Sequence, residues 1–395
     1  MKRYDEYKDS GVEWIGEVPR HWEVVPLKRA ITINNGCDYK HVQVEEDGYP
    51  VIGSGGQFAW ASQYMYDGEA VLLGRKGTID KPMYYNGKFW TVDTMFYGIP
   101  KKNANCKYLY YIAKNIPFER YATATALPSM TQTDLNNNTI CLPPLDEQSS
   151  IANYLDKKCS EIDKVISAQQ KRIALLQELK QSVITHAVTK GLDPNVEMKD
   201  SGVEWIGITP FSWKYCRFKD FLKLRTEASE SLTKIGLENI ESKSGKFIET
   251  GTEFEGNGVA FSTRNIVYGK LRPYLQKVWL AEFEGNAVGD FFVFEIKKNA
   301  IPSFIKYLML SDGFTKEADG STVGAKMPRV SSSFILTMHY CLPSIEEQQT
   351  IVEYLTKRCA SLDIALTKAQ HQVELLQEYK QSLITEVVTG KRKVS

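Results

Sequence analysis

The chain has 395 residues, of which 43% are hydrophobic and 25% charged, and its formal net charge is +1. These values are those of a soluble globular protein with two domains of ordinary size. No apolar run approaches the roughly 20 residues of a membrane span, and the first residues lack the apolar stretch of a secretory signal. A cytoplasmic protein is therefore expected.

The seven cysteines point to the same compartment. None belongs to a Cys-x-x-Cys pair, which argues for a reduced protein without a zinc site. Cys141 and Cys341, like Cys159 and Cys359, occupy matching positions of an internal repeat. We expect these four to pack in the core.

The chain begins with a segment that it later repeats. Residues 8–16 and 199–207 both read KDSGVEWIG, and each copy is followed by Pro-x-x-Trp, ending at Trp22 and Trp213. A second repeat starts at Cys141 and again at Cys341, with 23 of 51 aligned positions identical. The stretches between these repeats match poorly. Such a chain builds one scaffold twice and carries two different surfaces on it, which suggests a binder of two unlike targets.

Both variable regions are predicted to be β-rich with attached helices, because β-branched residues, aromatics and turn glycines dominate them. Each has a short apolar strand that ends in glycine and a basic turn, and a later strand that starts at an aspartate, so that Asp93 aligns with Asp290. A short helix and a polar loop follow. These paired elements are 71–77 and 266–272, 93–99 and 290–296, 108–115 and 304–312, and 127–134 and 324–330.

The low net charge hides basic clusters in both variable regions. Residues 262–279 hold four basic residues and no acid, and residues 101–118 hold four lysines and no acid. Lys326 and Arg329 lie in another stretch without acids. One such cluster is easily an ordinary solvated surface, but clusters in both regions favour a polyanionic partner.

The second repeat predicts a long helix in each copy. Prolines at 143–144 and 343 precede acids in a first turn, where the helix dipole favours them. Apolar residues then recur with heptad spacing, which indicates that the two helices pair. Because the first helix must lead the chain into the second repeat, we expect an antiparallel pair. Lys180 and Lys380 also fall in this seam, either fixing its register or extending from its edge. Leu175, Leu375, Ile184 and Ile384 lie off the seam, where we expect them to be exposed and available to another subunit. The seam residues are Leu155, Ile162, Ile166, Ile173, Leu176, Val183, Leu355, Leu362, Leu366, Val373, Leu376 and Leu383.

These segments, in this order, resemble the specificity subunits of type I restriction-modification systems (HsdS). The resemblance rests on KDSGVEWIG with its trailing tryptophan, on LPPLDEQ at 142–148 and LPSIEEQ at 342–348, and on LLQE at 175–178 and 375–378. It implies an α+β fold with two β-rich target-recognition domains, separated by two long antiparallel coiled-coil helices and related by a pseudo-two-fold axis. The expected domains are 1–142 and 191–342, with spacer helices in 143–190 and 343–395.

The resemblance also implies a non-catalytic role. Each recognition domain would read one half of a bipartite double-stranded DNA target. Two methyltransferase subunits would bind the frame and carry S-adenosylmethionine, and restriction subunits would use ATP and magnesium. No cofactor or metal is expected on this chain.

Candidate DNA contacts follow from side-chain chemistry. Lysine and arginine suit phosphates and guanine, whereas glutamine suits adenine. The candidates in the first variable region are Arg75, Lys76 and Gln132, and those in the second are Lys270, Arg272, Lys326 and Arg329. Gly74 and Gly269 are expected to shape the turns.

Enzymatic alternatives find little support. Neither glycine-rich stretch, 53–56 or 74–77, has the spacing of a phosphate-binding loop, and no Asn-Pro-Pro signature of an adenine methyltransferase occurs. Asp290 with Glu295 and Lys297 resembles a nuclease triad, but strand periodicity would point 290 and 295 to opposite faces. The remaining alternatives are a coiled-coil adaptor and a stand-alone DNA-binding regulator.

Overall fold

The computed structural model describes residues 3–118, 128–228, 233–324 and 326–394. The chain divides into two compact units, each assembled from separate stretches of sequence. The first unit contains residues 1–169 and 372–395, and the second contains residues 170–371. Both units therefore include part of each long helix. The expected domains were contiguous ranges, with each helix as a separate segment.

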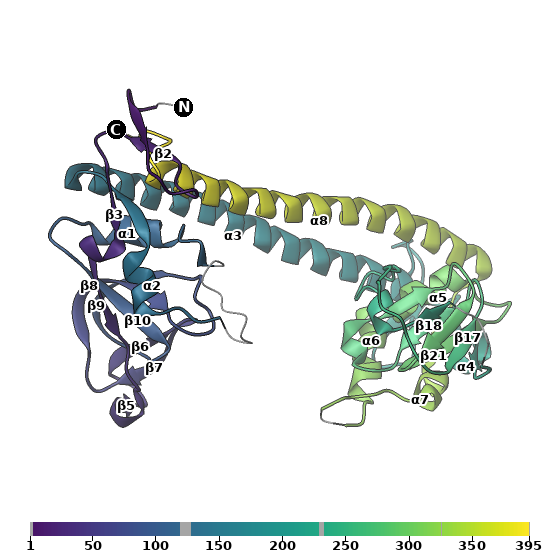
Figure 1. Ribbon diagram of the computed structural model, residues 1–395. Coiled ribbons are helices and arrows are strands. Elements are labelled where there is room, and N and C mark those ends of the chain that lie inside the picture. Colours follow the sequence, from purple (N-terminus) through teal and green to yellow (C-terminus); the bar gives the residue numbers. More distant parts are fainter. Residues whose placement is uncertain (1–2, 119–127, 229–232, 325, 395) are drawn as a thin grey trace. The chain divides into compact units, whose positions relative to one another are not determined.

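The first unit carries a seven-stranded mixed sheet, which is the framework of its variable region (Figure 1). Neighbouring strands are antiparallel, except that β6 and β9 run parallel. Helix α1 (Cys106–Ala113) packs against the sheet, and α2 (Gln132–Asn137) precedes the return to the scaffold. In spatial order the strands are β4 (Ile31–Asn35), β10 (Met95–Pro100), β8 (Tyr66–Gly74), β9 (Met83–Thr91), β6 (Tyr49–Gly53), β7 (Gly56–Ala61) and β5 (Gln43–Val44).

The second unit carries two smaller sheets and more helix. One sheet contains β15 (Leu222–Arg225), β21 (Phe291–Ile296), β18 (Ile266–Gly269) and β19 (Val278–Leu280), in that order. The other contains β16 (Lys234–Ile235), β20 (Gly285–Val288) and β17 (Gly258–Phe261). The helices are α4 (Phe218–Phe221), α5 (Pro302–Met309), α6 (Asp312–Gly320) and α7 (Ser332–Thr337). Helix α6, which begins at the Ser311 N-cap, was not expected from the sequence.

Each variable region is joined to its scaffold through a two-stranded stem. In the first unit β3 (Glu23–Pro26) pairs with β11 (Thr139–Leu142), and in the second β14 (Lys214–Arg217) pairs with β22 (His339–Leu342). The first lobe, residues 27–138, and the second lobe, residues 218–338, therefore enter and leave the scaffold at one place.

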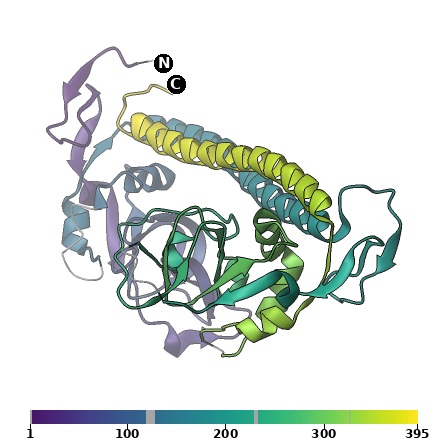
Figure 2. The same ribbon diagram turned by 90° about the vertical axis from the view of Figure 1, so that its right-hand side faces the viewer.

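The two predicted long helices are present as α3 (Leu145–Lys190, 46 residues) and α8 (Ile345–Val388, 44 residues) (Figure 2). They pair in antiparallel fashion. In the first unit Lys380 at the end of α8 binds Asp163 of α3 at 2.6 Å, and in the second Lys180 of α3 binds Asp363 of α8 at 2.6 Å. The repeat offset of 200 residues relates the two ion pairs. Both seam lysines are thus bound to the partner helix.

The predicted seam residues differ in burial. Leu155, Leu355, Leu362 and Leu383 are buried, as are Ile162 and Ile166. The other six are only half-buried, namely Ile173, Leu176, Val183, Leu366, Val373 and Leu376.

The off-seam expectation was half wrong. Leu175 and Leu375 are exposed, at 65% and 49%, but Ile184 and Ile384 are each only 1% exposed. These two isoleucines belong to the cores where the helix ends meet the lobes. Heptad position locates the contact between the two helices but does not account for the lobe packed beside them.

Cys141, Cys159, Cys341 and Cys359 are buried, which confirms their expected place in the core. No helix within the described parts of the chain combines the length and apolarity needed to cross a membrane.

Candidate nucleic-acid interface

In the first lobe, the basic turn after β8 is clipped to the loop before α2. The N–H of Arg75 donates to Thr94 O at 2.9 Å, and the O of Arg75 accepts from the N–H of Met130 at 2.9 Å. Gly77 N–H donates to Pro128 O at 2.9 Å, and Lys76 pairs with Ser129 as a β-bridge. Two loops far apart in sequence therefore form one short, backbone-braced surface.

The second lobe has the same clip. Lys270 N–H donates to Asp290 O at 2.9 Å, while Lys270 O accepts from Val330 N–H at 3.2 Å. Arg272 N–H donates to Pro328 O at 2.8 Å, and a β-bridge joins Leu271 to Arg329. We call the two braced surfaces, residues 74–77 with 128–130 and residues 269–272 with 328–330, the loop clips.

The matching hydrogen bonds assign equivalent positions. Arg75 corresponds to Lys270, and Ser129 corresponds to Arg329. Thr94, not Asp93, corresponds to Asp290, because Gly74 pairs with Met95 as Gly269 pairs with Phe291. The sequence alignment of Asp93 with Asp290 was therefore wrong by one residue.

The glycine that precedes each clip has a steric role, as expected. A Cβ at Gly74 would lie 2.2 Å from Thr78 O, because the chain folds back directly over it. At Gly269 a Cβ would lie 2.9 Å from Leu237 Cδ2. Both glycines permit the tight turn that brings the basic residues to the surface.

The first clip presents one engaged and one free cation. Arg75 is half-buried, donates from Nη1 to Asp93 O at 3.3 Å, and lies 5.8 Å from the ring centre of Phe96. Lys76 is exposed, and no hydrogen bond or ion pair holds its ammonium group in the described structure. Gln132 is half-buried, and its Nε2 donates to Ile33 O, so that its amide links α2 to β4.

The second clip presents one free cation, Arg272, and two held cations, and Lys326 lies beside it in sequence. Arg272 and Lys326 are exposed, and neither head group has a hydrogen-bond or ion-pair partner among the described residues. Arg329 binds Asp290 through Nε and Nη2, each at 3.0 Å, and Lys270 Nζ lies 3.7 Å from the same carboxylate. The hydrogen bond from Arg329 lowers the pKa of Asp290, so this carboxylate remains ionised well below neutral pH.

Not every residue of the basic clusters is available to a ligand. Lys277 Nζ donates to Leu237 O and Ile240 O, Lys101 Nζ donates to Lys28 O, and Lys107 pairs with Asp156. These lysines stabilise the lobes. Density of positive charge along the sequence therefore overstated the number of free cations.

The other two residues of the rejected nuclease pattern, Glu295 and Lys297, have structural partners. Glu295 pairs with Lys223 at 3.6 Å, and Lys297 Nζ donates to Lys219 O at 2.6 Å. Within the described residues, no three His, Cys, Asp or Glu side chains are placed to hold a metal ion.

The repeated tryptophan segment is anchored at the start of a long helix, in the same way in both copies. Trp22 Nε1 donates to Glu147 Oε2 at 3.1 Å, and Trp213 Nε1 donates to Glu347 Oε1 at 2.9 Å. The following glutamine is fully buried in both copies, and its Nε2 donates to the carbonyl of Pro143 or Pro343. The segments KDSGVEWIG-PxxW and LPxxxEQ therefore meet in space, which explains why both repeat together.

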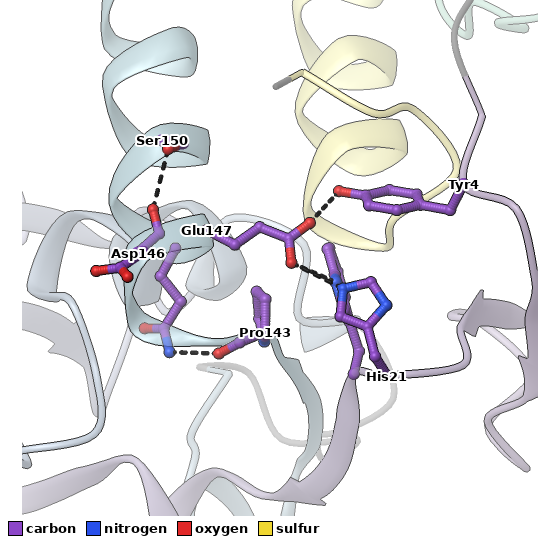
Figure 3. A network of polar contacts seen from close by, with 8 residues as sticks. Tyr4, His21, Pro143, Asp146, Glu147 and Ser150 are labelled. Atoms are coloured by element: carbon purple, nitrogen blue, oxygen red, sulfur yellow. Dashed lines mark hydrogen bonds and ion pairs between the residues drawn. The ribbon is translucent and has the colours of Figure 1, made fainter.

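The first anchor has two additional contacts to Glu147 (Figure 3). Tyr4 Oη donates to its Oε1, and His21 Nε2 lies 2.9 Å from its Oε2. In the second copy Ser212 stands in the place of His21. At the same place Tyr7 Oη donates to Gly390 O at 3.1 Å, so both chain ends are fastened to this helix junction.

Comparison with known proteins assigns this architecture. Residues 19–174 match the family model of the type I restriction modification DNA specificity domain. The specificity subunit of the Escherichia coli type I restriction enzyme EcoDI is 22% identical to the chain, over 95% of this chain and 89% of that protein. The MjaVIII specificity subunit of Methanocaldococcus jannaschii is 24% identical, over 82% and 76% respectively.

The chain carries a type I restriction modification DNA specificity domain over residues 19–174, and it is similar to specificity subunits over most of its length.

Solved structures show the same fold. A chain from a structure of complex assembly and conformational transition in a type I R-M system superposes with a TM-score of 0.69, at 12% identity, covering 94% of this chain and 98% of that one. The HsdS subunit of Thermoanaerobacter tengcongensis superposes with a TM-score of 0.50, at 14% identity, covering 95% and 98%. At such low identity the likeness shows a shared fold alone.

Proposed function

We propose that this specificity subunit reads a bipartite double-stranded DNA target, one half with each lobe. The observation that carries the proposal is the pair of loop clips. They share one backbone hydrogen-bond pattern, yet they display different side chains: Arg75, Lys76 and Ser129 on one, and Lys270, Arg272 and Arg329 on the other. One framework with two chemistries suits two unlike half-sites.

The two spacer helices have two tasks in this proposal. As an antiparallel pair they set the separation between half-sites, and they dock the methyltransferase subunits. The docking surface is supported by apolar residues that stay exposed on both helices at matching repeat positions. In the first unit these are Leu375 and Tyr379, exposed at 49% and 51%, and in the second they are Leu175 and Leu179, at 65% and 41%. We call these two pairs the docking pairs.

The subunit acts without catalysis in this proposal. The methyltransferase partners bind S-adenosylmethionine and modify adenine, and the restriction partners use ATP and magnesium. Free cations on the loop clips fit DNA backbone and base contacts, a task that requires no bound cofactor.

The deciding experiment is methylome sequencing of a host that expresses the neighbouring methyltransferase gene, with and without this chain. We expect a bipartite adenine motif that disappears when the chain is absent. A variant with Lys76, Arg272 and Lys326 replaced by alanine serves as a matched protein that keeps the scaffold. Unchanged methylation in all three strains, with the partner shown to be expressed, would contradict the proposal and favour an adaptor or a stand-alone regulator.

A further inference from the structure

The Arg329 side chain in the second loop clip is held from one side only. Its Nε and Nη2 each donate to a different oxygen of Asp290 at 3.0 Å, which is the side-on arrangement of an arginine–carboxylate pair. The guanidinium carries five N–H groups in a rigid plane, and this arrangement uses two of them. The fork formed by Nη1 and the outer N–H of Nη2 remains unused in the described structure.

That unused fork has a definite partner chemistry. Two parallel N–H donors at the end of a guanidinium match the O6 and N7 acceptors of guanine in the major groove, the commonest specific arginine–base contact. An arginine that is free to rotate binds any nearby phosphate equally well. An arginine that is fixed by a carboxylate presents its donors in a single direction. It therefore discriminates better between bases but contributes less to sequence-independent affinity for DNA.

The backbone beneath Arg329 is fixed as well. Val323 N–H donates to Arg329 O at 3.2 Å, and Arg329 N–H donates to Val323 O at 3.3 Å. On the other side Leu271 bridges to the same residue. Arg329 therefore stands in a small three-stranded patch, held by main-chain bonds from both flanks and by Asp290 at its tip.

Exposure separates the two members of the pair. The Asp290 side chain is 23% exposed and the Arg329 side chain 46%, so the carboxylate is the shielded member and the guanidinium faces outward. The equivalent positions in the first lobe, Thr94 and Ser129, cannot form such a pair. The arrangement thus belongs to the second lobe alone.

We propose that Arg329 contacts a guanine in the half-site read by the second lobe, and that Asp290 is the positioning residue that makes this contact selective. The proposal rests on the proposed function, because it names the base class that one of the two clips reads. Arg272 and Lys326, which have no partner in the described structure, supply sequence-independent phosphate contacts beside it.

The test is the motif that each variant methylates in the host, together with its partner methyltransferase. We expect the wild-type half-site of the second lobe to contain a guanine. Arg329→Lys and Asp290→Asn should each relax that position about tenfold or more, which is the discrimination that a bidentate pair provides. Asp290→Glu, which keeps the charge, should restore part of the selectivity. The other half-site should not change.

Glu295→Gln is the matched control, because it removes a nearby carboxylate in β21, the strand that Asp290 precedes, and this carboxylate pairs with Lys223 at 3.6 Å. It should methylate the wild-type motif. A second readout is DNA binding at rising salt concentration. Asp290→Asn frees a guanidinium to bind phosphate, so the slope of the logarithm of the binding constant against the logarithm of salt concentration should become steeper by about one.

Three outcomes would overturn the inference: a second half-site without guanine, a motif unchanged by Arg329→Lys, or relaxation by Arg329→Lys with full selectivity in Asp290→Asn. Failure of the proposed function looks different, since the wild-type chain would then direct no bipartite methylation at all. Misfolding is also distinguishable, because it would abolish methylation instead of relaxing one base.

Discussion

At the scale of single residues, two arginines of the second lobe share exposure and backbone conformation but differ in their place relative to the loop clip. Arg272 and Arg264 stand at opposite ends of β18, both exposed and both with left-handed backbone, at φ 50° and 71°. Only Arg272 belongs to a loop clip. Substituting each arginine in turn therefore distinguishes the loss of a DNA contact from the effect of changing a residue in a strained backbone conformation.

We expect Arg272→Ala to weaken binding at the second half-site several-fold. The slope of the logarithm of the binding constant against the logarithm of salt concentration should decrease in magnitude by about 0.9, because the variant neutralises one phosphate fewer. Lys326→Ala should behave in the same way. Fluorescence anisotropy of the complex on DNA with one half-site altered at a time measures both. Arg264→Ala is the control, and an equal reduction of affinity there would argue against the loop clip as the DNA surface.

The buried anchor glutamines predict a local loss of stability. Gln348 is fully buried and joins Ile301 N–H, Asn299 O and Pro343 O, whereas the side chain of neighbouring Gln349 is exposed and donates to Glu353. Gln348→Ala leaves buried backbone groups without partners and should cost about 3 kcal/mol of unfolding free energy. Gln349→Ala should cost less than about 0.5 kcal/mol. Urea denaturation of the two variants compares them directly, and similar midpoints would refute the anchor role.

At the scale of elements, the long helices combine two kinds of apolar residue. Their ends are buried by the lobes, whereas the docking pairs stay open to solvent. The ion pairs Lys180–Asp363 and Lys380–Asp163 fix the register between the helices in each unit. In the second unit Lys246 also reaches Asp363, at 3.3 Å, so that ion pair includes a residue of the lobe. Which residues of a long helix are buried thus depends partly on the other helix and partly on the lobe beside it.

Charging the docking pairs should prevent assembly without unfolding the subunit. We expect Leu175→Glu with Leu375→Glu to reduce methyltransferase binding at least tenfold, because each carboxylate would be buried without a partner in the complex. Size-exclusion chromatography with light scattering reports the mass of the assembly. Glu178→Gln with Glu378→Gln, on the same helices, should assemble normally. Full assembly of the leucine variants would place the methyltransferases elsewhere.

The sequence was most informative where a pattern occurred twice. Repeats and heptad spacing located both long helices, both lobes and the basic turns Arg75-Lys76 and Lys270-Leu271-Arg272. It was least informative where the outcome depends on a distant neighbour. Three findings depend on such tertiary contacts. Ile184 and Ile384 are buried, and Gln132 donates to Ile33 O. Arg329 pairs with Asp290, which lies 39 residues away in sequence.

At the scale of the whole molecule, the two long helices contribute residues to both units. We expect removal of one heptad from α3 and one from α8, at matching repeat positions, to shorten each helix by about 10 Å. The preferred number of bases between half-sites should fall by about three as a result, since base pairs of B-DNA are spaced by roughly 3.4 Å. Methylome sequencing reads this spacing directly. An unchanged spacer would mean that the helices do not determine it.

The two-stranded stems have a consequence for how such a gene can change. Each lobe begins and ends on neighbouring strands, with one further main-chain bond closing each entry, from Leu27 to Asn138 and from Phe218 to Met338. The stretches 27–138 and 218–338 are therefore self-contained cassettes, each flanked by the repeated segments of the scaffold. Recombination within those repeated segments can replace a whole lobe in one event, while the long helices stay unchanged. A new pair of target sequences can then arise by exchange of cassettes, without gradual mutation of any reading loop.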